Sequence, residues 1–218
     1  MSVSSNPTPA QVLAEVVPKL LLGGPTGLTY HQVGEVVVVS DVVECTGPGC
    51  REWVSADRLP PGRYPVWAGY RVDCGPLDYP YDYAQDGGED EPWRSPVAAI
   101  VVLAPGTDPS TLPVLTFDRF PELTYFGPEI AFVRDASATG LLAWGPGPHP
   151  ALNALTERTT LALRDADRAG TVPNVVVAEL SPATGVNVIA LPVDETVGEM
   201  YDCYGVDEEF ICAIWTVG

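Results

Sequence analysis

The sequence predicts an α+β fold in which a mostly antiparallel β-sheet core is combined with two helices. Most apolar residues fall in short runs rich in Val and Ile, bounded by Pro, Gly or Asp, which is typical of strands. Only two stretches show helical spacing, one at the N-terminus and one near residues 151–169. These elements come in blocks and do not alternate strictly, which favours α+β over α/β. With 218 residues and 46% hydrophobic content, the chain can form a sizeable core, and we expect one domain over residues 1–218.

The first helix is predicted from its start signal. Thr8 is a typical N-cap residue, Pro9 occupies the first helical position, and Gln11 completes a capping box. Pro18 should kink or end this helix, because its ring removes one backbone donor and crowds the preceding turn. We expect its buried stripe to consist of Val12, Leu13, Val16 and Leu20.

The strands and the second helix follow from periodicity. The second helix is the most strongly patterned element, with apolar residues at helical spacing between 149 and 170 and Gly170 at the position of a C-terminal cap. The strand candidates before it span 35–44, 63–74, 95–104, 112–120 and 129–135, and those after it span 174–180, 186–193, 199–206 and 208–217.

The net charge of the chain indicates which classes of partner it can bind. It carries 29 acidic and 11 basic residues, which give a net charge of -18. Such a surface repels phosphate backbones, so we expect no nucleic-acid partner and favour basic proteins instead. No apolar stretch is long enough to span a membrane and no secretory signal is present, so we expect a cytoplasmic protein that does not bind membranes.

The segment ECTGPGCREW, residues 44–53, places two of the five cysteines around a Gly-Pro turn. Cys45 and Cys50 have a spacing that a zinc site allows, but no second local pair of ligands completes it. A disulfide across the turn is geometrically possible, although a cytoplasmic chain would not normally keep it. We therefore predict reduced thiols at a hairpin tip, and neither a metal nor another cofactor.

The sequence contains none of the short motifs of common enzyme classes. It has no Gly-x-Ser-x-Gly elbow, no His-Glu-x-x-His, no phosphate loop and no dinucleotide fingerprint. His31 and His149 are interpreted as turn or capping residues. An alternative is a small hydrolase with a carboxylate or metal site around Asp41, Asp135 and Asp207, each of which ends a strand candidate. Asp also commonly caps turns at such positions, so a purely structural role of these three residues stays open beside the hydrolase site.

Residues 74–95 combine clustered carboxylates with tyrosines and show no apolar period. Tyrosine offers rigid contact area with a polar tip, and carboxylates accelerate encounter with a basic surface. A disordered solubilising insertion would have the same composition. We predict that this acidic Tyr-bearing loop is the binding surface of a non-enzymatic, immunity-like interaction module, with Asp78, Tyr79, Tyr81, Asp82, Tyr83, Asp86 and Asp90 as its contact residues.

Three blocks of the sequence stand out together, namely GEVVVVSD, LPPGRYPV and the closing GEMYDCYGVDEEF. They resemble the domain-of-unknown-function 4241 family, which is common in bacteria, and the resemblance runs from about residue 33 to the end. This chain lacks the Gly-Thr-Gly-Cys core of the family's middle block. The resemblance implies no activity. The shared residues are Gly34, Ser40, Asp41, Pro61, Gly62, Tyr64, Pro65, Val66, Tyr125, Gly127, Phe132, Asp135, Gly198, Gly205 and Asp207.

Overall fold

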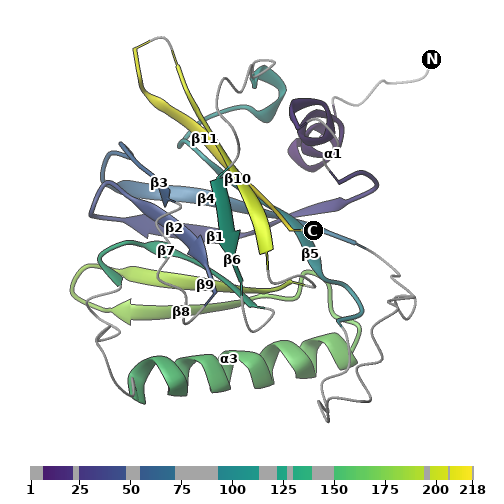
Figure 1. Ribbon diagram of the computed structural model, residues 1–218, viewed down its shortest axis with the longest axis vertical. Helices are drawn as coiled ribbons and strands as arrows, with labels where there is room; N and C mark the ends of the chain where they lie inside the picture. Colours follow the sequence, from purple (N-terminus) through teal and green to yellow (C-terminus); the bar gives the residue numbers. More distant parts are fainter. Residues whose placement is uncertain are drawn as a thin grey trace.

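The computed structural model places the residues that it describes in two β-sheets and, on the outer faces of the sheets, two α-helices, so that four layers are formed (Figure 1). It describes residues 7–21, 25–47, 55–71, 93–112, 122–126, 130–138, 150–193, 197–205 and 207–217. Helix α1 (Pro9–Leu20) covers the outer face of one sheet, and helix α3 (Pro150–Arg168) covers the outer face of the other. A 3-10 turn, η2 (Pro109–Thr111), lies beside α1.

Within each sheet, every pair of neighbouring strands is antiparallel, which confirms the predicted antiparallel α+β architecture. Sheet A contains, in spatial order, β1 (Thr29–Val38), β4 (Gly62–Tyr70), β5 (Val97–Leu103), β11 (Phe210–Val217), β10 (Val197–Tyr204) and β6 (Glu122–Tyr125). Sheet B contains, in order, β3 (Ser55–Ala56), β2 (Val43–Thr46), β7 (Ile130–Asp135), β9 (Val186–Pro192) and β8 (Val176–Ser181).

Three apolar clusters hold the layers together. The largest lies between the two sheets and includes Trp215 and Tyr70, both fully buried. The second joins α1 to the outer face of sheet A, and the third joins α3 to the outer face of sheet B. Because both sheets are covered on two sides over their centres, β5 and β9 are buried along their whole lengths. The continuous apolar run of β5, and that of β9 apart from Asn187, follow from this position.

Helix α1 begins as predicted and continues farther than Pro18 suggested. The Thr8 backbone N–H donates to Gln11 Oε1 at 2.8 Å, and the Gln11 backbone N–H donates to Thr8 Oγ1 at 3.3 Å, which completes the capping box. Pro18 lies inside the helix, which ends only at Leu20. The predicted stripe is also corrected in part, because the residues that are most buried against sheet A are Leu13, Val17 and Leu21.

The predicted strand over 35–44 is in fact two strands that belong to different sheets. The chain turns at Asp41, which has a left-handed backbone with φ 66°, so that β1 ends at Val38 and β2 begins at Val43. Strand β1 also starts earlier than predicted, at Thr29. The short strands β3 and β6 were not predicted, and the strand predicted over 112–120 lies almost wholly outside the described residues.

The side chain of Asn187 joins the two sheets at the edge of sheet A. It lies on β9, while β1 forms the edge of sheet A next to β4. The Val37 backbone N–H donates to Asn187 Oδ1 at 2.9 Å, and Asn187 Nδ2 donates to the carbonyl oxygen of Glu35 at 2.8 Å. One buried amide therefore satisfies an N–H and a C=O of an edge strand, as a neighbouring strand would.

Replacing Asn187 with alanine is expected to lower the free energy of unfolding by about 2 kcal/mol, because the buried Val37 N–H loses its acceptor. Urea denaturation followed by tryptophan fluorescence measures the change. Asn153→Ala is the matched control, since Asn153 is exposed on α3 and should shift the midpoint little. Equal midpoints for the two variants would contradict this role of Asn187.

Candidate functional site

The turn between β10 and β11 projects beyond the rest of sheet A and is acidic (Figure 1). We use the name hairpin end for its acidic and aromatic residues together with Asp57 and Arg58, the two residues after β3 that contact them. The turn is closed by backbone bonds from Gly205 N–H to the Glu209 oxygen at 2.8 Å and from Glu208 N–H to the Gly205 oxygen at 3.0 Å. The hairpin end consists of Asp57, Arg58, Asp202, Tyr204, Asp207, Glu208 and Glu209.

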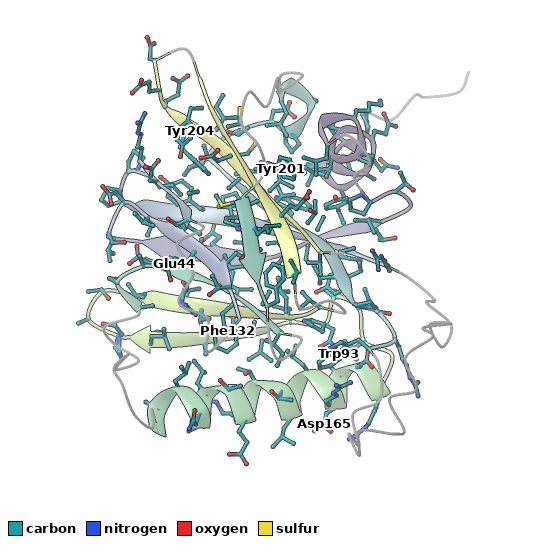
Figure 2. The ribbon with its side chains drawn as sticks, in the orientation of Figure 1. Glu44, Trp93, Phe132, Asp165, Tyr201 and Tyr204 are labelled. Carbon is teal, nitrogen blue, oxygen red and sulfur yellow. The ribbon has the colours of Figure 1, made fainter. Side chains whose placement is uncertain are left out.

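Tyr204 fixes the hairpin end to the segment after β3. Its hydroxyl donates to Asp57 Oδ1 at 2.7 Å, and it accepts from the Asp57 backbone N–H at 3.3 Å. Arg58 adds an ion pair with Glu208 at 2.7 Å and lies 5.6 Å from the centre of the Tyr204 ring. Burial and the Asp57 carboxylate both raise the pKa of Tyr204, so the phenol keeps its proton and remains a donor. Figure 2 shows Tyr204 near the projecting end of β10.

The hairpin end carries more negative than positive charge. Asp57, Asp207, Glu208 and Glu209 are exposed, whereas Arg58 is its single cation. The Arg58–Glu208 pair is exposed on both sides and contributes little stability, and the carboxylates of Asp207 and Glu209 are exposed beside it. The geometry presents several carboxylates beside a half-buried tyrosine ring, which suits contact with a basic surface.

Asp135, one of the three carboxylates considered for a hydrolase, has a structural role. It ends β7, is fully buried, and accepts from the backbone N–H groups of Val39 at 2.7 Å and Ser40 at 2.9 Å. The Ser40 and Ser137 hydroxyls and the Ser137 backbone N–H donate to it as well. These bonds tie the end of β7 in sheet B to the turn that follows β1 in sheet A.

Hydrogen bonding determines the ionisation of Asp135. Burial alone would raise its pKa, but the bonds from Ser137, Ser40 and Val39 outweigh burial and hold the pKa below its usual value. A general acid or base needs a pKa nearer to the working pH and access to a substrate, and Asp135 has neither. The geometry therefore does not favour the hydrolase alternative at this carboxylate.

The structure does not bring the three carboxylates into one site. Asp41 is exposed in the turn beside Ser40, so it lies next to the Asp135 network, while Asp207 belongs to the hairpin end. Among the residues that the structure describes, the bonds to Asp135 come from residues 39, 40 and 137. Over the described ranges, no three His, Cys, Asp or Glu side chains are grouped so that they could hold a metal ion.

A groove on the outer face of sheet A was not predicted from the sequence. It has a volume of about 280 Å³ and lies between the start of α1, strands β1 and β4, and the turn before η2. Trp67 is half-buried in it, and Arg63 pairs with Glu35 at 3.5 Å at its edge. The strand alternation that places Arg63 and Trp67 on the outer face, opposite Tyr64 and Val66, could be read from the sequence, but the covering elements could not.

The predicted binding loop lies mostly outside the described residues. This applies to Asp78, Tyr79, Tyr81, Asp82, Tyr83, Asp86 and Asp90. The final residues of the segment are described and are anchored to α3. Trp93 is buried with Arg164 over its ring at 3.8 Å, and the Arg94 backbone N–H donates to Asp167 (Figure 2). Trp93 has no regular secondary structure, in keeping with a loop, but its side chain is part of the core under α3.

Cys45 is a free thiol in the core between the sheets, and its burial raises its pKa well above the usual value. Cys50 and His149 lie outside the described residues, so the predicted hairpin tip is described only on the Cys45 side. His31 lies within β1 and packs edge-on against Tyr70, so its interpretation as a turn residue is wrong.

No family model, curated protein or solved structure matches the chain. None of the helices in the described ranges has the length and apolar character needed to cross a membrane. The site is therefore interpreted from its own geometry and charge.

Proposed function

We propose that the chain is a non-enzymatic, acidic interaction module that binds a basic protein in the cytoplasm. The observation that carries this proposal is the net charge of -18 combined with a projecting hairpin end rich in carboxylates. Excess negative charge steers a positively charged partner toward the surface, and Tyr204 adds rigid contact area among the acids. The acidic Tyr-bearing loop, with Asp82, Asp86 and Asp90, is the second surface proposed to contact the partner.

We also propose that the chain is related to the domain-of-unknown-function 4241 family. Two of the blocks that carry the resemblance are in contact, since the Ser40 hydroxyl of the first block donates to Asp135 of the middle block at 3.0 Å. Gly198 of the last block has a packing reason to be glycine, because a Cβ there would lie 2.1 Å from the Thr216 carbonyl oxygen. A structure of a member of that family with a different strand order in its sheets would contradict the relation.

Charge reversal at the two surfaces tests the proposed function. The tagged full chain is used to capture proteins from a host lysate at low and physiological ionic strength. Two triple variants are compared with the wild type, one carrying Asp82→Lys, Asp86→Lys and Asp90→Lys and the other Asp202→Lys, Asp207→Lys and Glu208→Lys. At least one should reduce capture of the basic partner by about tenfold, and added salt should reduce wild-type capture in the same way.

The matched control changes the net charge by the same amount elsewhere. Glu15, Glu157 and Glu179 are exposed on α1, α3 and β8, and their replacement by lysine should leave capture nearly unchanged. Equal losses in all three variants would show that total charge acts without a specific surface. Undiminished capture by both surface variants would refute the proposed binding role.

A further inference from the structure

Cys203 and Cys212 lie directly opposite each other on neighbouring strands. Cys203 is on β10, Cys212 is on β11, and the ladder pairs their Cα atoms. Directly opposed residues of antiparallel strands have Cα atoms about 4.5 or 5.5 Å apart, and both values fall within the range that a disulfide spans. Both thiols are free and lie in the same apolar cluster on the outer face of sheet A. The strand register therefore places the two cysteines as neighbours within the distance range of a disulfide.

The two thiols differ in exposure and in acidity. Cys212 is fully buried in the cluster beneath α1, whereas Cys203 keeps 8% of its surface exposed. The hydrogen bond from the Cys212 thiol lowers the pKa of Cys203 and outweighs burial and the repulsion from Asp202 and Glu209. The same bond, burial and the charge of Cys203 raise the pKa of Cys212. Cys203 is therefore the thiol that ionises first and that a reagent can reach.

We propose that Cys203 and Cys212 form a peroxide-reactive dithiol, in which Cys203 is the attacking cysteine and Cys212 the resolving one. This site is separate from the proposed partner-binding role. The partner implied is a small hydroperoxide such as hydrogen peroxide, because only a small oxidant suits a thiol with so little exposed surface.

The reaction balances in two steps. The Cys203 thiolate attacks one peroxide oxygen, the O–O bond breaks, and the hydroxide that leaves takes up a proton as water, which gives a sulfenic acid on Cys203. The Cys212 sulfur then attacks the Cys203 sulfur and the S–O bond breaks. The thiol proton of Cys212 leaves with the departing hydroxide as a second water. Two thiols and one peroxide thus become one disulfide and two waters.

The sequence allows this disulfide to be identified directly. Cleavage after glutamate at Glu199, Glu208 and Glu209 puts Cys203 in peptide 200–208 and Cys212 in peptide 210–218. Cys45 and Cys50 share a third peptide, 45–52, and Cys74 lies in a fourth. The native full chain is treated with hydrogen peroxide, its remaining thiols are alkylated, and the non-reduced digest is analysed by mass spectrometry. Peptides 200–208 and 210–218 should appear as one linked species that a reductant separates.

Two variants assign the roles of the cysteines. In Cys212→Ala the sulfenic acid cannot be resolved, so dimedone should label Cys203 nearly completely. In Cys203→Ala, dimedone should not label Cys212. Comparable labelling of Cys212 would overturn the assigned order. The wild-type result does not depend on either variant folding.

The urea-unfolded chain shows that the reagent oxidises accessible thiols in the same experiment. Absence of the linked peptides from the native chain would overturn the proposal. A more abundant link from Cys203 to Cys45, Cys50 or Cys74 would overturn it as well, because the pairing would then not follow the strand register.

Discussion

Replacing Asp135 with alanine is expected to lower the free energy of unfolding by about 3–4 kcal/mol, the largest loss expected from a single polar side chain here. The change removes the acceptor for three backbone N–H groups, those of Val39, Ser40 and Ser137, and for two hydroxyl groups. It also releases the turn after β1 from the end of β7. Urea denaturation monitored by circular dichroism measures the loss.

The matched variant Asp135→Asn keeps one acceptor oxygen and should lose less stability. It also isolates the charge. Because the folded pKa of Asp135 lies below its unfolded value, its ionised form stabilises the fold above about pH 4, and this contribution is lost as the pH falls through the folded pKa. The wild type should lose this contribution on acidification and Asp135→Asn should not. Carboxyl groups titrate between about pH 2 and 6. If the stabilities of the wild type and Asp135→Asn changed in parallel over that range, the role of the charge would be refuted.

Gly198→Ala is expected to lower the free energy of unfolding by about 3 kcal/mol, because the added methyl group has no room. Its Cβ would lie 2.1 Å from the Thr216 carbonyl oxygen and 2.6 Å from Phe126 Cε2. The first contact is with the backbone of the neighbouring strand β11, so a change of side-chain rotamer cannot relieve it. The strands must separate locally, and a thermal melt should show a clear decrease of the midpoint.

Gly62→Ala is the control for that experiment. Gly62 begins β4, and a Cβ there would meet its nearest neighbours at 3.6 and 3.7 Å, which is ordinary contact. Its unfolding free energy should change by no more than about 0.5 kcal/mol. If the two glycine variants melted alike, the close approach of β11 to Gly198 would be contradicted.

Local signals in the sequence predicted individual elements well. The capping box of Thr8 and Gln11 fixed the start of α1, and the helical period fixed α3. The turn at Asp41 was missed because apolar residues continue on both sides of it, so that two strands look like one. The expected end of the helix at Pro18 was overridden by packing, since Val17 and Leu21 hold the last turn against sheet A.

The division into two sheets could not be derived from the strand patterns. Strand β1 pairs with β4 while β2, only a turn away, pairs with β7, and nothing local distinguishes the two choices. One signal did carry information. The run at β5 is apolar at every position, and the run at β9 is apolar except at Asn187, which indicates strands covered on both faces and therefore outer layers on both sheets.

The candidate sites depended on contacts between distant residues. Tyr204 and Asp57 are 147 positions apart, so the hairpin end could not be assembled from the sequence. The cysteine pair was closer to being predictable. Cys203 and Cys212 flank one turn between two predicted strands, and a symmetrical hairpin places such residues opposite each other.

The position of β11 in sheet A affects how the chain can fold during synthesis. It follows every other strand in the sequence, yet it lies between β5 and β10. Until the ribosome has produced Val217, the β1–β4–β5 half and the β6–β10 half have no strand to connect them, and Trp215 is missing from the interior. A nascent chain stalled just before β11 should therefore bind chaperones and be cut by proteases, whereas one that includes it should become resistant.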